Sequence, residues 1–319
     1  MAKIRRRKCA GHLIFFLITC LASSNPELNA RTVGDLIVHD LIPDLINFLR
    51  IAPEEEVDRA MLFKQIVIQP YPEVYDRPQV FRTDPGALEK YLVELGEYLP
   101  AIENIHRRFI EERASIQARF LSTFPDFNTS RARIYLMLSL FRFDGKIPHD
   151  NPHILLLGLD GLAKFHGTNV RLPVILSHEL FHLYHFQVNP LPRDADQIEL
   201  YRLIWQEGLA TYVSHVLNPD ASLAEVLLDP RLAEEGPRFI PMLAHDLLAQ
   251  LESTDDETAA RYLSYRRGGQ IPARMGYLIG YEIAKRAAAA HPLTELARLR
   301  GHALLNLVRQ EMQILEEKR

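Results

Sequence analysis

Residues 178–182 read H-E-L-F-H, an instance of the pattern H-E-x-x-H. On a helix, His182 lies only about 40° round the axis from His178 and roughly 6 Å further along it, so both imidazoles can reach one zinc ion. Glu179 lies on the flank of that face, where it can deprotonate a water held by the metal but is poorly placed as a third ligand. The chemistry indicated is hydrolysis.

The residues around this pattern are largely apolar, and Pro173 suits the first turn of a helix. The apolar positions are Val174, Ile175, Leu176, Leu180, Phe181 and Leu183. We therefore expect a buried helix. Histidine and glutamate side chains inside such a helix are costly unless they are paired or bind a metal, so a chance occurrence on a solvated surface explains the pattern poorly.

A zinc ion held in a hydrolytic site needs a third protein ligand and one open position. Glu207 is the main candidate, because it lies 25 positions after His182 on a separate predicted helix and would complete a His₂Glu set, a known catalytic zinc type. His185 lies on the same face as His182 and is expected to pack or support the site. His215 and Glu199 are weaker alternatives.

At this point the chain resembles the gluzincin metallopeptidases, in which a glutamate on a following helix completes H-E-x-x-H. The second motif of the aminopeptidase N-type enzymes runs W-x-N-E-G-F-A-x-Y, and residues 205–212 here run W-Q-E-G-L-A-T-Y, with one residue fewer between tryptophan and glutamate. Those enzymes also carry a later Y-x-x-G motif whose tyrosine stabilises the oxyanion. The resemblance therefore implies that role for Tyr277, which begins Y-L-I-G, with Tyr281 as the rival.

The combination of H-E-x-x-H, E-G-L-A and G-Y-x-x-G-Y is most similar to a bacterial family of predicted zinc-dependent proteases, over roughly residues 130–315. The aminopeptidase strand motif G-x-M-E-N is absent from the equivalent residues 157–161, so aminopeptidase specificity is not implied. An edge strand at 153–159 would pair with an extended peptide, which suits an endopeptidase. Arg266, Arg267 and Arg274 would orient a substrate carboxylate or lie on the solvated surface.

The pattern of elements predicts an α+β, zincin-like domain that is mostly helical with a small sheet. Two stretches rich in strand-forming residues, 133–141 and 153–159, precede the H-E-x-x-H helix, and the first ends at the turn signal Asp144-Gly145. Helical spacing is found at 33–49, divided at Pro43, and at 86–99, 101–122, 196–217, 237–252, 274–290 and 293–315. These assignments give a signal peptide at 1–24, a mostly helical N-terminal region at 25–130 and a catalytic domain at 131–319.

The first residues are basic and are followed by an apolar stretch from Cys9 to Ala22, which is typical of a secretory signal peptide. We expect the chain to be exported to the periplasm or secreted. Cys20 also resembles the cysteine of a lipobox, so a lipid anchor is an alternative, as is an uncleaved N-terminal anchor. Both cysteines lie in this segment, so a chain cut after Ser24 has no disulfide.

Charge limits the partners of the mature chain. The full chain has 37 basic and 41 acidic side chains, and residues 1–24 contain five of the basic ones and no acid, which leaves a net charge of about −9. Binding to nucleic acid or to an anionic membrane surface is not expected. The expected partner is a peptide or protein substrate, and the N-terminal region is expected to cover the cleft, to pack behind it or to be a removable pro-segment.

The sequence therefore predicts a zinc peptidase in which Zn²⁺ is bound by His178, His182 and Glu207, Glu179 is the general base and Tyr277 is the oxyanion donor. An endopeptidase is favoured. The alternatives are a secreted or lipid-anchored protein that uses the same scaffold to bind zinc without turnover, and a zinc hydrolase that acts on a bond other than a peptide.

Overall fold

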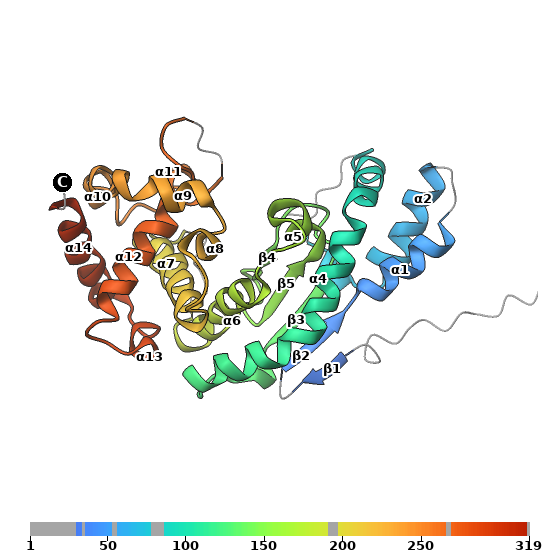
Figure 1. The fold of residues 1–319 in the computed structure, drawn as a ribbon, viewed down its shortest axis with the longest axis horizontal. Coiled ribbons are helices and arrows are strands. Elements are labelled where there is room, and N and C mark those ends of the chain that lie inside the picture. Colours follow the sequence, from blue (N-terminus) through green and yellow to red (C-terminus); the bar gives the residue numbers. More distant parts are fainter. Residues whose placement is uncertain are drawn as a thin grey trace, which may run out of the picture.

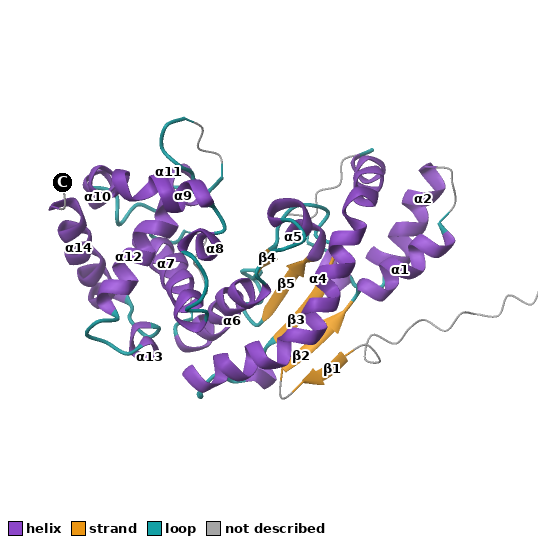
Figure 2. Ribbon diagram, viewed as in Figure 1, coloured by secondary structure: helices purple, strands orange, loops and turns teal. Residues whose placement is uncertain are grey.

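The computed structural model describes residues 30–33, 36–52, 56–77, 86–190, 197–265 and 269–317. It confirms an α+β fold that is mostly helical with one small sheet (Figures 1 and 2). The predicted signal peptide, Cys20, Arg266 and Arg267 lie outside the described residues. None of the described helices has the length and apolarity that crossing a membrane requires.

The sheet has five strands in the order β1-β2-β3-β5-β4. Strands β2, β3 and β5 are parallel, whereas β1 and β4 run antiparallel at the two edges. The strands are β1 (Ala30–Val33), β2 (Leu36–Asp40), β3 (Arg133–Met137), β4 (Gly145–Lys146) and β5 (Ile154–Gly158). The strands predicted at 133–141 and 153–159 are therefore present, although both are shorter than predicted.

Alternate residues of the strands pack into two different clusters because successive side chains point to opposite faces of a sheet. On one face, Ile134, Leu136, Leu155 and Leu157 join the main core beneath the helices. On the other face, the strand side chains pack with residues from the segment around helix α3 (Pro72–Tyr75). The strand residues on this face are Tyr135, Met137, Ile154 and Leu156. Both faces of β3 and β5 are covered, and β5 is accordingly buried at every position.

Two predictions about the sheet are wrong. Residues 36–40 form β2 rather than helix, and Pro43 lies in the first turn of helix α1 (Ile42–Ile51) instead of dividing a longer helix. Pairing with β3 supplies the backbone partners that make this segment a strand. Strand β5 is not at the edge of the sheet, because the two-residue strand β4 pairs with it on that side. The strand at this edge of the sheet is therefore β4.

The long N-terminal helix packs on the same face of the sheet as the two helices that follow β5. A single helix, α4 (Ala87–Thr123), replaces the two helices predicted on either side of Pro100, and it buries the stripe predicted for its second half, namely Ile102, Ile105, Phe109, Ile116 and Phe120. The other elements of this part are α2 (Glu56–Phe63), the π-helix η2 (Lys64–Ile68) and the 3₁₀ turn η3 (Thr129–Arg131).

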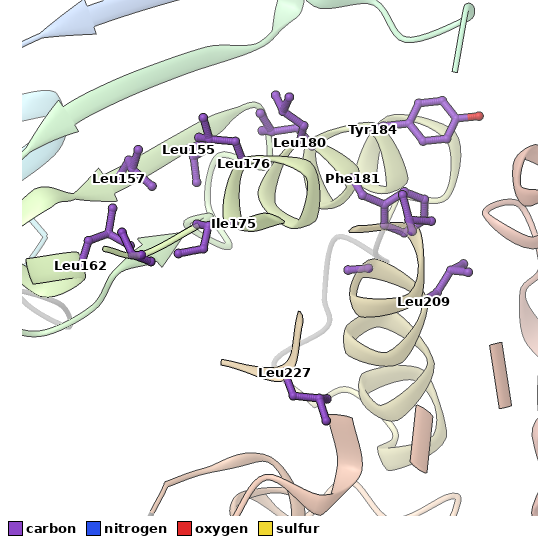
Figure 3. Close-up of a cluster of buried hydrophobic side chains, with 14 of the residues drawn as sticks. Leu155, Leu157, Leu162, Ile175, Leu176, Leu180, Phe181, Tyr184, Leu209 and Leu227 are labelled. Atoms are coloured by element: carbon purple, nitrogen blue, oxygen red, sulfur yellow. The ribbon is translucent and has the colours of Figure 1, made fainter. Parts of the chain in front are cut away.

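Helix α6 (Leu172–Val188) contains H-E-x-x-H and lies between the sheet and the C-terminal helices (Figure 1). Figure 3 shows that Leu176 and Leu180 lie toward β5, whereas Phe181 lies beside Leu209 of helix α7 (Leu200–Leu217). Helix α6 is apolar around most of its circumference, as expected of a helix buried on several sides. Pro173 is in its first turn, as predicted. Helix α5 (Leu159–His166) connects β5 to it.

The C-terminal third is helical. After α7, the helices are α8 (Leu223–Leu227), α9 (Pro230–Glu235), η4 (Gly236–Phe239), α10 (Ile240–Leu248), α11 (Asp256–Leu263), α12 (Met275–Ala287), α13 (Leu293–Leu296) and α14 (Gly301–Glu317). Helices α7 and α12 cross at Gly208 and Gly280. A Cβ atom at either glycine would overlap the backbone of the other helix. The absence of side chains at this crossing allows the two helices to touch through their backbones.

Candidate metal centre

Three predicted ligands meet at the contact between α6 and α7. The Nε2 atoms of His178 and His182 are 2.9 Å apart, and Glu207 Oε2 lies 3.4 Å from the first and 3.5 Å from the second. All three ligand atoms lie within 4.8 Å of one another, and no other group of three such side chains meets this criterion among the described residues. The structure therefore brings together the three side chains that were predicted to share a metal.

The donor set fits zinc. Ligand atoms placed about 2.0–2.2 Å from a tetrahedral zinc ion are separated from one another by roughly 3.4 Å. The measured separations between the two imidazole nitrogens and the carboxylate oxygen, from 2.9 to 3.5 Å, are close to this value. Two neutral imidazoles and one carboxylate also form a set that leaves one coordination position open, as hydrolytic zinc sites require.

The three candidate ligands shift one another's pKa values. Burial would raise the pKa of Glu207, but the neighbouring rings of His182 and His178 outweigh burial and hold this pKa well below its ordinary value. Glu207 is therefore a carboxylate at neutral pH. The pKa of His178 is lowered, chiefly by burial, which favours the neutral imidazole that a metal needs.

Glu179 lies beside this group without belonging to it. Burial raises its pKa to about 8, with further contributions from Asp144 and Glu207. Its carboxyl group lies against Gly145 of β4, so closely that a Cβ atom at position 145 would be 2.6 Å from Glu179 Cδ. A carboxyl group whose pKa is raised toward the neutral range, next to a candidate metal centre, is suited to accept and return a proton.

Tyr277 lines the same cavity, on the first turn of α12. Its ring is nearly parallel to that of His178, with 6.5 Å between the ring centroids. Burial raises its pKa well above the ordinary value, and the carboxylate of Glu207 adds to the rise, so Tyr277 keeps its proton and can donate a hydrogen bond. Its rival Tyr281 pairs with Nδ1 of His215 at 2.8 Å and does not line the cavity.

The weaker ligand candidates lie elsewhere. His185 contacts Asn189 through Nε2, and its Nδ1 atom is buried without a partner in the part of the chain that the structure describes. Burial lowers its pKa to about 3. His215 is occupied by Tyr281, and Glu199 pairs with Arg202 at 3.0 Å ahead of α7. None of these three side chains joins the group around Glu207.

The candidate centre opens into a cavity of about 340 Å³. Helices α6, α7 and α12 form one side, and the turn and strand at 144–147 form the other. Asp144 fixes that second wall, because its carboxylate binds His166 Nε2 at 2.6 Å and accepts the N–H of Gly145 at 2.8 Å. The sequence indicated only a turn at Asp144 and Gly145, since no local pattern shows that they face Glu179.

The loop that leads into β4 is built on one buried carboxylate. Asp160, which is fully buried, accepts the N–H groups of Ser139 and Phe141 at 2.6 and 2.8 Å and the hydroxyl of Tyr91 at 3.1 Å. Leu140 and Phe141 both have a φ of 56°, a strained value for residues with a side chain. The hydrogen bonds to Asp160 hold this turn, which in turn places β4 at the cavity.

Comparison with known protein families agrees with the predicted similarity to zinc-dependent proteases. Residues 160–304 match the model of a family described as "Predicted Zn-dependent protease (DUF2268)". The matched segment includes the three candidate ligands, Glu179 and Tyr277. No curated protein and no solved structure matches the chain. Over this segment the chain is similar to a family of predicted zinc-dependent proteases.

Proposed function

We propose that the protein is a zinc-dependent peptidase, and that His178, His182 and Glu207 hold the metal. The observation that carries this proposal is the triangle of ligand atoms with sides of 2.9, 3.4 and 3.5 Å, next to a separate, partly buried glutamate. A purely structural zinc site closes its fourth position and has no use for such a base. The match of residues 160–304 to a family of predicted zinc-dependent proteases supports the same conclusion.

When bound at these three side chains, zinc would act as a Lewis acid that polarises the scissile carbonyl and acidifies water. Glu179 takes the proton from the attacking water and then delivers it to the leaving amine. Tyr277 donates a hydrogen bond from its phenol to the oxygen on which negative charge develops. Its raised pKa keeps that proton in place at neutral pH.

We further propose that cleavage occurs within a chain rather than at its amino terminus. The free edge of β4 lies in the cavity wall, where an extended peptide can add to the sheet by main-chain hydrogen bonds. The strand motif that binds a free amino group in aminopeptidase N-type enzymes is absent from 157–161. These two features favour an endopeptidase.

The test replaces Glu179 with Gln. The variant is expected to bind zinc like the wild type and to lose about 10²- to 10⁴-fold in kcat, because the general base is removed and the ligands remain. Elemental analysis and the cleavage of a peptide library, each with and without a chelator, provide the measurements. Glu111→Gln is the control, because Glu111 is an exposed partner of Arg107 on α4. A Glu179→Gln variant that cleaves peptides at the wild-type rate would rule out the mechanism.

We also propose that the chain is exported, on the basis of the basic and apolar residues at its N-terminus. Intact mass analysis of the protein recovered from a periplasmic fraction tests this proposal. Loss of residues 1–24 indicates signal cleavage, whereas a chain that begins at a lipid-modified Cys20 indicates the lipid anchor. Recovery of the full-length chain from the cytoplasm alone contradicts export.

A further inference from the structure

Arg274 is a buried cation in the wall of the candidate active site. Only 7% of its surface is exposed, yet it lines the cavity that contains His178, Glu179 and Glu207. It precedes helix α12 and has a φ of 56°, which is uncommon for a residue with a side chain. Strained backbone of this kind is concentrated where a side chain is held for binding or catalysis.

The surroundings of Arg274 orient its guanidinium without neutralising it. The group lies over the ring of Tyr277 at 4.0 Å and over that of Tyr265 at 4.7 Å, and it donates a hydrogen bond to the carbonyl of Leu227 at 2.9 Å. Within the described ranges, no carboxylate lies within 4.0 Å of its nitrogens. Asp144, a nearby acid of the cavity wall, is paired with His166.

A buried charge without a counter-ion is costly, and buried arginines are normally paired with an acid. Two tyrosine rings reduce this cost by cation–π attraction, and the Leu227 carbonyl and the tyrosine hydroxyls accept hydrogen bonds, but none of these groups brings the negative charge that would balance the guanidinium. The edge of the guanidinium plane has the geometry that binds a carboxylate through two parallel hydrogen bonds. The missing partner of Arg274 is therefore an anion that enters the cavity.

We infer that Arg274 recognises a carboxylate of the substrate and so determines the specificity of the site. This inference rests on the proposed peptidase function. The ring of Tyr277 neighbours both the Arg274 guanidinium and the ring of His178, so the recognised carboxylate would bind next to Tyr277. An aspartate or glutamate side chain of the substrate and a free C-terminus offer the same chemistry.

The experiment uses fluorescein-labelled hexapeptide libraries in two matched pairs. One pair is amidated at the C-terminus and carries either Asp and Glu or Asn and Gln at one position. The other pair is neutral in its side chains and ends in either a carboxylate or an amide. Cleavage by the wild type and binding to the Glu179→Gln variant, measured by fluorescence anisotropy, are both recorded for each library.

The wild type is expected to prefer the charged member of one pair by about 10- to 100-fold, the range expected for a charge-assisted bidentate contact. Arg274→Gln should abolish the preference, and Arg274→Lys, which keeps the charge without the planar fork, should retain part of it. Arg238→Gln is the control and should keep the preference. Arg238 also lies over an aromatic ring, that of Phe239 at 4.7 Å, but its side chain is 64% exposed outside the cavity.

Equal cleavage and binding of both members in each pair by the wild type would overturn the inference, as would an undiminished preference in Arg274→Gln. A role limited to positioning Tyr277 would lower kcat for all libraries alike and leave the preference unchanged. Charge-dependent binding without cleavage would keep the inference and reject the peptidase function. Cleavage without charge dependence would reject the inference and keep the peptidase function.

Discussion

At the scale of single residues, the site depends on a contact between a glycine and the proposed base. The carboxyl group of Glu179 fills the space that a side chain at position 145 would need. Gly145 is held in turn by the Asp144 carboxylate, which is anchored to His166. The position of the proposed base is thus set from the sheet side of the cavity, whereas the proposed ligands belong to the helices.

We predict that Gly145→Ala lowers kcat by about 10-fold or more and leaves zinc content unchanged. The added methyl group displaces the Glu179 carboxyl group, which can rotate away at little cost in stability, because it is the end of a flexible side chain. A displacement of the general base by about 1 Å is enough for a loss of this size. Elemental analysis, thermal unfolding and peptide cleavage together test it, and a Gly145→Ala variant with wild-type kcat would contradict it.

The sequence predicted those features of the site that depend on local spacing. H-E-x-x-H fixes the relative positions of His178 and His182 because both lie on one helix. Glu207 was assigned with the help of a second motif, residues 205–212. Tyr277 was chosen over Tyr281 because of the resemblance to the gluzincin metallopeptidases. The burial of Arg274 and the role of Gly145 depend on which distant elements meet at the cavity, and no local pattern encodes that.

At the scale of elements, the crossing of α7 and α12 places the second half of the site. Glu207 precedes Gly208 on α7, and Tyr277 lies one turn before Gly280 on α12. Because the two glycines let the helices touch through their backbones, the carboxylate and the phenol lie at one cavity. The glycines of E-G-L-A and Y-x-x-G therefore have a packing role.

We predict that Gly208→Ala destabilises the protein by about 1–3 kcal/mol, as overpacking typically does, and weakens zinc binding. The methyl group overlaps the backbone at Gly280, which cannot move without separating the helices. Gly96→Ala is the matched control. Gly96 is an exposed residue inside α4, and a Cβ atom added there would meet no atom within 4 Å, so alanine should stabilise by about 0.5–1 kcal/mol. Urea unfolding measures both changes, and equal effects at the two positions would refute this explanation.

Prediction of the elements succeeded where the periodicity was strong and local. The helices around 178–182, 200–217 and 275–287 and the strands β3 and β5 follow from their apolar patterns. Strand β2 was missed because its apolar residues also fit helical spacing, and only pairing with β3, far along the chain, decides between the two. Strand β4 has two residues, too few to leave a periodic signal.

At the scale of the whole molecule, the cavity lies between a half that contains the sheet and a half made of C-terminal helices, with α6 between them (Figure 1). Every residue that lines it comes from 144–277. None of the described residues of the region 25–130 lines it; they pack away from the cavity, where β2 pairs with β3 and α4 covers α5 and α6. Of the three arrangements expected for this region, packing behind the cleft agrees with the structure.

We predict that residues 131–319 alone do not form a stable cooperative fold. Removing 25–130 exposes the backbone edge of β3 and the apolar faces of Ile134 and Leu136, which β2 and α4 cover in the full chain. Circular dichroism and thermal unfolding of the truncated chain test this prediction, with residues 25–319 as the control. A cooperative transition at the temperature of the control would show that the region is dispensable.

The contact between Gly208 and Gly280 also has a consequence for tracing the ancestry of such chains. A five-letter zinc signature recurs by accident, but two small residues more than seventy positions apart have no reason to persist together unless their helices touch. Related proteins that inherited this helix crossing should retain both glycines or replace both together. Genome surveys that require the pair alongside the signature would separate genuine descendants from coincidental matches.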